Sequence, residues 1–219
     1  TVVDIELGGL GDKGTLEFLR TQYDYEIDRL SSNPGVHLFE KLISSLYLGD
    51  LAWMIIQELI NKNLLFRGAL SKNQRYSGYM LPLDKPGFLT AKKLSEIEMD
   101  SGVKFTTTQR LLEELGLKDA SYDDCSIFKH VCDLVSMRSA QLAAAGLAAL
   151  INYLNQTNVV IAVDGSLYRH HQKFRQNLDI TVARLVNRDI SYQIVLNEEG
   201  SAKGSAIVAA MQDQRDELI

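Results

Sequence analysis

Residues 159–166 read VVIAVDGS, and this stretch decides the fold class. Five apolar residues in a row, Val159 to Val163, are typical of a strand that is covered on both faces, as in a parallel sheet. The strand ends at the turn Asp164-Gly165-Ser166, and a helical pattern follows to about Val186. A strand, a glycine turn and a helix in this order predict an α/β fold.

The same order recurs nearer the end of the chain. Ser191 to Leu196 predicts a second strand, residues 197–204 read NEEGSAKG, and Ser205 to Met211 predicts a small-residue helix. A glycine between strand and helix lets backbone N–H groups approach an anion, so two such turns on neighbouring strands can form a nucleotide crevice. Glycine can equally serve the turn geometry alone, and neither turn fits a Walker A loop or a dinucleotide motif.

The part of the chain before these strands is predicted to be mainly helical. A short strand is expected first, from Val2 to Glu6, ending before the glycine-rich residues 8–11. The apolar spacing then predicts helices over Thr15–Leu30, Leu38–Leu65, Thr90–Glu98, Thr107–Leu115 (ended by Gly116), and from a cap at Asp123-Asp124 to about Asn155. Gly49 should mark a bend or a close helix contact, and Gly68 to Phe88 is interpreted as a connecting excursion.

Two carboxylates lie close to loop glycines. Glu6 comes just before Gly8, and Glu40 opens a helix soon after Gly35. A carboxylate can accept hydrogen bonds from two adjacent sugar hydroxyls, which makes both residues candidates for a sugar site. The alternative is that they are solvated carboxylates that favour a helix dipole.

No metal site is predicted. His170 and His171 are adjacent, so on a helix they point about 100° apart and cannot both face one ion; we expect both on the surface near a helix start. Cys125 and Cys132 lie two helical turns apart, roughly 10 Å, which is too far for a disulfide. Buried, reduced cysteines are expected, and they fit a cytoplasmic chain.

Composition limits the classes of function. With 46% apolar and 23% charged residues, the 219-residue chain can bury a core. Its formal charge of −5 argues against a nucleic-acid surface. The longest apolar stretch, Leu142 to Ile151, is about half of the ~20 residues that span a bilayer, and no secretory signal is visible. The first residue is Thr1 rather than Met, so we expect a piece of a longer protein.

Long motifs resemble one known family. Residues 33–50 read NPGVHLFEKLISSLYLGD and resemble the hexokinase segment NPGxxLFEKMISGMYLGE almost residue for residue. ELGGLGD (6–12) is similar to the family's EWGAFGD, RTQYD (20–24) to RTxFD, and VDGSLY (163–168) to its second phosphate motif. EGSAKG (199–204) resembles the adenosine motif DGSGKG; the stretches 88–98 and 138–142 resemble LSxIE and RxAxL. These matches run in order along the chain, which therefore resembles the carboxy-terminal, large-lobe portion of a hexokinase.

The resemblance implies a fold and an activity. Residues 1–219 are expected to form an α/β, ribonuclease-H-like large lobe of the actin-like ATPase and sugar kinase class, with a substantial helical layer. The implied activity is ATP-dependent phosphorylation of a hexose such as glucose at its 6-hydroxyl, the first step of glycolysis, with Mg²⁺ arriving on the ATP. The implied partners are the hexose, ATP and the small lobe of the same polypeptide; a homo-oligomer is compatible with them.

The resemblance also implies which residues bind the substrates. The sugar-binding residues are Glu6 and Glu40. The nucleotide-binding residues are Gly165 and Ser166 at the phosphates and Glu199, Gly200 and Ser201 at the adenosine. Thr90, Lys92 and Ser95 match the family's T-K-x-x-S nucleotide loop once a one-residue insertion is allowed.

The sequence departs from the family pattern in several places. Leu7 replaces a tryptophan, Asp4 an asparagine, Glu199 an aspartate and Ala202 a glycine. Ala202 is the most serious departure, because a Cβ is awkward where the backbone must approach a ligand or adopt φ > 0. The family's first phosphate loop and its catalytic Asp have no counterpart in these residues, so no catalytic residue is assigned and the chain alone is expected to be inactive.

Two other interpretations stay open. Tandem hexokinases resemble a pattern in which one half is catalytically silent and binds a sugar or a partner protein in a regulatory role; Ala202 fits that pattern. An α/β domain without any ligand is the third interpretation, and motifs at both ends of the chain count against it.

Overall fold

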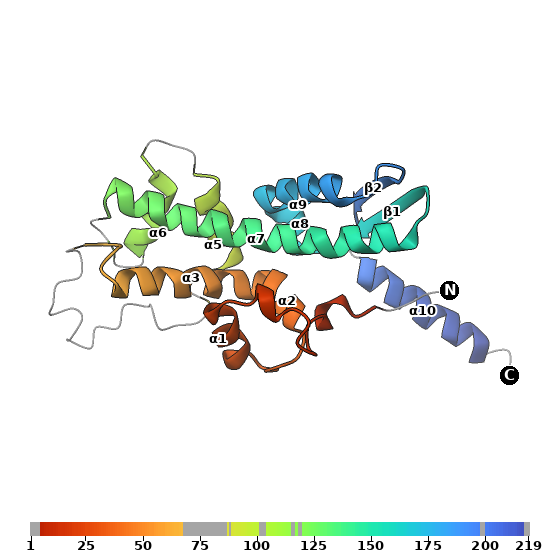
Figure 1. Cartoon of the computed structure of the whole chain (residues 1–219). Helices are drawn as coiled ribbons and strands as arrows, with labels where there is room; N and C mark the ends of the chain where they lie inside the picture. The colour runs from red at the N-terminus through yellow and green to blue at the C-terminus, as the bar shows by residue number, and fades with distance from the viewer. Residues whose placement is uncertain are drawn as a thin grey trace.

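The structure is a computed structural model that describes residues 5–67, 87, 89–100, 104–114, 117, 120–197 and 200–216. Its longest element is helix α7 (Tyr122–Leu154), which runs through the middle of the molecule. The helices α1 (Gln22–Leu30), α2 (Leu38–Ile43) and α3 (Ser45–Asn61) lie along one side of it. At one end α7 meets α5 (Ala91–Glu98) and α6 (Thr106–Glu114), and at the other a small sheet with its helices (Figure 1).

Helix α7 has its N-cap two residues before the acidic pair that was predicted to cap it. Ser121 is the N-cap, since its hydroxyl accepts a hydrogen bond from the Asp124 N–H at 3.1 Å. In return the Asp124 carboxylate accepts from the Ser121 N–H at 2.9 Å. Asp123-Asp124 therefore lies inside the first turn, and the start is a capping box. The helix ends where the sequence predicted, with Asn155 as its C-cap, and this residue has a left-handed backbone conformation.

Buried side chains of α7 contribute to two apolar clusters. In its first half Phe128, Cys132 and Val135 pack with residues of α3, α5 and α6. In its second half Ala140, Ala144 and Ala148 pack against α9 (Gln172–Leu185). Among the described residues α7 is the one helix long and apolar enough to span a bilayer, with a window of mean hydropathy 1.5. These packing contacts account for its apolar character.

Three segments predicted as single helices are each interrupted by a polar residue. Ser44 separates α2 from α3 and accepts a hydrogen bond from the Leu46 N–H. Thr21 forms a capping box with Asp24, which separates the short 3₁₀ helix η2 (Glu17–Leu19) from α1. His171 separates α8 (Ser166–His170) from α9 and accepts from the Phe174 N–H at 3.3 Å. In each case a side chain captures an N–H group that would otherwise continue the helix.

Gly49 marks a close contact rather than a bend. Helix α3 continues through Gly49, and a Cβ at this position would lie 1.4 Å from the Leu89 carbonyl oxygen. The next residue, Asp50, accepts a hydrogen bond from the Gly87 N–H at 2.7 Å. Helix α3 thereby holds the chain just before α5, which starts at the N-cap Thr90.

The two strands β1 (Asn158–Val163) and β2 (Ser191–Leu196) are parallel neighbours, as predicted, with Val163 opposite Leu196. Both strands therefore end at the same edge of the sheet. The prediction that both faces are covered is wrong for the described residues. Val159, Ile161 and Val163 pack on the cluster of α7 and α9, whereas Val160 is 69% exposed, because both helices lie on one side of the sheet.

The first predicted strand is also corrected where it can be seen. Residues 2–4 lie outside the described residues; Ile5 pairs with neither strand, and Glu6 has a left-handed backbone with φ 43°. A strand needs a neighbour to satisfy its N–H and C=O groups, and the described sheet has only β1 and β2. Glu6 instead precedes a 3₁₀ turn, η1 (Leu7–Gly9).

The remaining elements agree with the sequence in outline. Helices α5 and α6 are confirmed to within one residue, while Gly116 and nearly all of 68–88 lie outside the described residues. Cys125 and Cys132 are free and buried on α7. Helix α10 (Gly200–Asp216) starts five residues earlier than predicted, and it extends away from the other helices in Figure 1, with residues 202–210 exposed.

We expect Gly49→Ala to lower the free energy of unfolding by about 3 kcal/mol or more, at the upper end of overpacking costs, because the added methyl must displace the backbone at Leu89. Thermal or urea unfolding of the purified protein measures this. Gly204→Ala is the control: it has open space around it on exposed α10, and should leave stability unchanged or raise it by up to ~1 kcal/mol. Equal stabilities for the two variants would contradict the close-contact interpretation.

Candidate functional site

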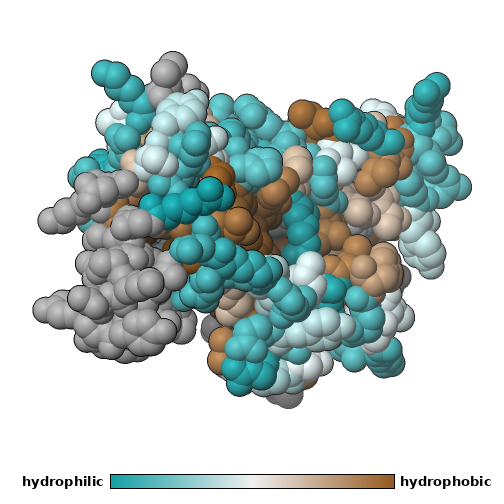
Figure 2. Space-filling model, turned by 60° about the vertical axis from the view of Figure 1, so that its left-hand side comes forward, coloured by the Kyte–Doolittle hydropathy of each residue, from teal (hydrophilic) through white to brown (hydrophobic). Residues whose placement is uncertain are grey.

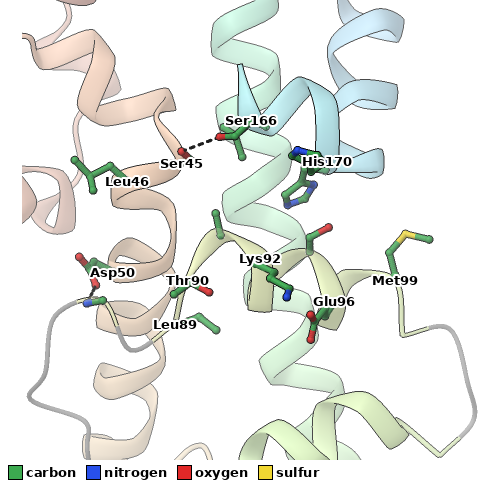
Figure 3. A pocket seen from close by; sticks show the side chains of 15 residues that line it. Ser45, Leu46, Asp50, Leu89, Thr90, Lys92, Glu96, Met99, Ser166 and His170 are labelled. Atoms are coloured by element: carbon green, nitrogen blue, oxygen red, sulfur yellow. Dashed lines mark hydrogen bonds between the residues drawn. The ribbon is translucent and has the colours of Figure 1, made fainter. Parts of the chain in front are cut away.

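A cavity of about 870 Å³ lies between α3, α5 and α8. Figure 3 labels residues that line it, among them Leu46 and Asp50 of α3, Lys92 and Glu96 of α5, and Ser166 of α8. The volume is in the range of small-molecule sites, which combine apolar walls with a few polar groups. On the face seen in Figure 2, apolar surface is likewise recessed between hydrophilic side chains.

Helix α5 directs its predicted nucleotide residues into the cavity. Its opposite face, with Leu94 and Ile97 fully buried, is anchored in the core. Lys92 and Ser95, three residues apart on α5, line the cavity, and so does the N-cap residue Thr90. Thr90 also caps the helix, since its hydroxyl accepts from the Lys93 N–H at 3.3 Å.

Ser166 enters the same cavity from the start of α8. Its hydroxyl lies 3.4 Å from that of Ser45, the first residue of α3 (Figure 3). Gly165 is the N-cap of α8 with an extended φ of 170°, and a Cβ there would meet no atom within 4 Å. Neither the backbone conformation nor the packing therefore requires a glycine at this position. The alternative that Gly165 serves only the geometry of the turn is not supported. The glycine instead leaves open space beside the cavity.

The predicted sugar residues lie together at a different place. The Glu40 side chain on α2 is 50% exposed, with its Oε2 3.3 Å from His37 Nδ1. A Cβ on Gly8 would be 3.4 Å from Glu40 Cβ, so the turn that follows Glu6 lies against α2. Neither Glu6 nor Glu40 lines the cavity.

Asp12 positions this sugar-side cluster, and the sequence did not single it out as a site residue. Its two carboxylate oxygens accept hydrogen bonds from the N–H groups of His37 and Leu38, at 3.0 and 2.9 Å. The bond from Leu38 contributes most to holding the pKa of Asp12 below its usual value. Asp12 thus ties the glycine-rich turn to the start of α2, three residues before Glu40. Asp12 is the last residue of the ELGGLGD motif, and that position was the feature of the sequence that could have marked it as a site residue.

The adenosine residues are not part of the cavity. Gly200 opens α10 and does not line it. Glu199 lies outside the described residues, as does the side chain of Ser201, so their assignment stays a prediction. Ala202 is exposed on α10 and is not among the described residues with positive φ, so its methyl group strains no backbone there.

Comparison with known proteins decides the family. The family model described as Hexokinase matches residues 1–211. The chain belongs to the hexokinase family. It is 38% identical to mouse hexokinase-1 and 39% identical to horse hexokinase-2, in each case over 95% of this chain, but it spans only 21% and 22% of those relatives.

A solved hexokinase shares the fold. The hexokinase from Schistosoma mansoni complexed with glucose superposes with a TM-score of 0.83 at 34% identity, over 95% of this chain and 45% of its own. The chain therefore has the actin-like ATPase and sugar kinase fold, here helix-rich with a small sheet. A second hexokinase crystal structure, 24% identical over 83% of this chain and 38% of its own, has a TM-score of 0.65 and supports the fold alone. Hexokinases as a family phosphorylate sugars.

Behind the cavity of this hexokinase chain lies a buried acid–base pair, Glu98 of α5 and His171 at the α8–α9 junction. They are 2% and 3% exposed, and Glu98 Oε2 lies 3.1 Å from His171 Nε2. Burial, with a smaller contribution from the charge of Asp133, raises the pKa of Glu98 to about 8. Burial lowers the pKa of His171 to about 4. At neutral pH both side chains are therefore uncharged.

The sequence missed this pair. His171 was predicted to be on the surface; that holds for His170, which is exposed, and is wrong for His171. The histidine is buried because it ends α8 and its ring caps α9. The spacing of Glu98 offered a signal, since it follows Leu94 by four residues and so lies on the apolar face of α5.

We expect the melting temperature to fall as the pH rises from 6.5 to 8.5. In that window Glu98 is ionised in the unfolded chain, where its pKa is near 4.5, but holds its proton in the folded protein up to about pH 8. The folded state then binds more protons, and stability falls with pH. His171 has the opposite effect, because its pKa is lowered in the folded protein: its contribution to stability is lost as the pH falls from 6.5 toward 4. The contributions of Glu98 and His171 therefore offset each other between about pH 4.5 and 6.5.

Differential scanning calorimetry on wild type and Glu98→Gln measures this slope. Glu98→Gln should flatten it, because glutamine cannot ionise, whereas Glu113→Gln, on the exposed face of α6, should leave it as in wild type. A slope that persists in Glu98→Gln would show that other groups cause it.

Proposed function

We propose that the full-length gene product containing this chain is an active hexokinase that transfers the γ-phosphoryl group of ATP to the 6-hydroxyl of a hexose, with glucose as the first candidate. One observation supports it most: the predicted nucleotide residues of two distant segments, Thr90 to Ser95 and Ser166, line a single cavity. The cavity joins the Lys92 ammonium group and four hydroxyl groups with apolar walls, a combination suited to a nucleotide.

The nucleotide half of the proposed site is made for charge neutralisation and positioning. Phosphoryl transfer depends on both, since the protein itself does little covalent chemistry. Lys92 supplies the positive charge, and the hydroxyls of Thr90, Ser95 and Ser166 supply hydrogen bonds. The carboxylates of Asp50 and Glu96 also line the cavity, and that of Asp50 is held by the Gly87 N–H. Within the described residues no group of three His, Cys, Asp or Glu side chains is arranged to hold a metal ion. Mg²⁺ is therefore proposed to arrive held by the ATP phosphates.

The sugar half of the proposed site is the exposed cluster of Glu40 and the turn after Glu6. Carboxylates accept hydrogen bonds from adjacent hydroxyls, and the half-exposed Glu40 is open to a ligand. The similarity to a schistosome hexokinase that was complexed with glucose favours glucose as the hexose.

The proposal concerns the full-length gene product. The chain covers 45% of the schistosome hexokinase, and by resemblance the catalytic Asp and the first phosphate loop belong to segments other than these residues. Closure of two lobes around the substrates also excludes water from such sites. The 219-residue chain on its own is therefore expected to be inactive.

We expect Glu40→Ala in the full-length gene product to raise the dissociation constant for glucose by about 10- to 100-fold, because a charge-assisted hydrogen bond worth ~1.5–3 kcal/mol is lost. Equilibrium titration with glucose measures it. Glu26→Ala is the control, since Glu26 is an exposed carboxylate that pairs with Arg29 on α1 and should leave glucose affinity unchanged. An unchanged affinity in Glu40→Ala would assign Glu40 to the helix start alone.

The silent regulatory half remains the competing proposal, and nucleotide binding separates the two. An active hexokinase should bind both glucose and a non-hydrolysable ATP analogue, and Ala202→Gly should change the Michaelis constant for ATP by less than tenfold (~1.4 kcal/mol). Calorimetry and steady-state kinetics on the full-length gene product measure these quantities. Glucose binding without any nucleotide binding, restored in part by Ala202→Gly, would establish the silent half.

A further inference from the structure

The pair of Glu98 and His171 lies between the two segments that line the nucleotide cavity. Glu98 belongs to the same eight-residue helix as Lys92 and Ser95, and its side chain is buried. His171 directly follows α8, whose first residue is Ser166, and its own ring contributes to the cavity wall. The 3.1 Å contact between the two side chains thus joins α5 to the α8–α9 junction behind the cavity.

Helices α5 and α9 both pack on α7, and the approach of Glu98 to His171 links the two segments directly. The atoms Glu98 Oε2 and His171 Nε2 have no hydrogen-bond partner among the described residues, and the 3.1 Å approach is one of proximity rather than of hydrogen-bond geometry. Both side chains are almost fully buried, so water cannot compete for them. Two buried polar atoms favour an arrangement that keeps them close, because separating them leaves each without a polar group in reach.

We propose that Glu98 and His171 form a positioning pair, which holds α5 against the α8–α9 junction so that Thr90, Lys92 and Ser95 face the same nucleotide as Ser166. The inference rests on the proposed function, since it assigns the pair a role in ATP binding. Neither residue is proposed to contribute to catalysis; each acts through the segment that carries it.

The tautomer of His171 follows from its hydrogen bond to the backbone. His171 Nδ1 accepts from the Phe174 N–H, so the neutral ring carries its proton on Nε2, which faces Glu98. Glu98 keeps its proton at neutral pH, and the contact is one between uncharged groups.

The charges around the pair come from α7 and α9. Asp133 and Lys129 of α7 and Lys173 of α9 act on Glu98, and the Ser136 hydroxyl faces its carboxyl group. Asp133 is itself paired with both lysines, at 2.7 and 3.0 Å. Both lysines lower the pKa of Glu98, but burial and the charge of Asp133 outweigh them, so an ionised Glu98 remains unfavourable here. The geometry of α5 should accordingly loosen above about pH 8.

Steady-state kinetics on the full-length gene product test the proposal. Glu98→Ala and His171→Ala should each raise the Michaelis constant for ATP at least tenfold, while the constant for glucose changes less than twofold. Glu98→Gln, which keeps a neutral side chain of the same size, should stay within threefold of wild type at pH 7. In wild type the Michaelis constant for ATP should rise between pH 7.5 and 9, and Glu98→Gln should remove that rise.

Asp24→Asn is the matched control for a loss of stability alone. Asp24 is buried and holds two hydrogen bonds from Arg138, at 2.9 Å each, but it lies on α1 away from the cavity. It should lower the melting temperature without changing the Michaelis constant for ATP. If Glu98→Ala behaves in the same way, the pair is merely structural and the inference is overturned.

The proposed function and this inference fail in different ways. A wild-type protein that binds no ATP analogue would overturn the proposed function, and the inference with it. A wild-type protein that turns over ATP, with variants whose Michaelis constants for ATP are unchanged, would overturn the inference alone. Hydrogen exchange of the α5 amides adds a readout without activity: protection should fall in Glu98→Ala and persist in Glu98→Gln.

Discussion

The packing of α9 on the small-residue face of α7 is the contact on which the rest of this structure depends. Ala140, Ala144 and Ala148 are buried with side chains of one methyl group, so the two helices can approach closely. Helix α9 in turn covers one face of the sheet and starts directly after α8. The position of Ser166 in the cavity is therefore set by a helix contact far from any ligand.

Helix α5, the other wall of the cavity, is held by contacts of different kinds. At its start, Gly49 of α3 allows the backbone at Leu89 to approach closer than any side chain would permit. At its end, Glu98 meets His171. Leu94 and Ile97 anchor the face between them in the core. Isolated helices of this length are unstable in water, so α5 depends on these three contacts for its structure. With them in place, it can present Lys92 and Ser95 to the cavity.

Local patterns predicted the elements well and their interruptions poorly. The periodicity of apolar residues located nearly every helix, because burial of one face dominates helix stability in proteins. Ser44, Thr21 and His171 each end a predicted helix, since their side chains capture backbone N–H groups in competition with the helix. Whether a polar residue caps a helix or lies inside it depends on what its neighbours pack against. The periodicity of apolar residues carries no information about that packing.

The sequence by itself determined the family, the parallel pairing of the two strands and four of the residues that line the cavity, Thr90, Lys92, Ser95 and Ser166. Those features follow from contiguous motifs, whose side-chain chemistry and order are legible along the chain. Only the tertiary structure decided that Gly165 is free of steric demand, that Asp12 ties the glycine-rich turn to the helix of Glu40, and that Glu98 meets His171. These depend on segments far apart in sequence, and burial in a shared core, not local propensity, brings them together.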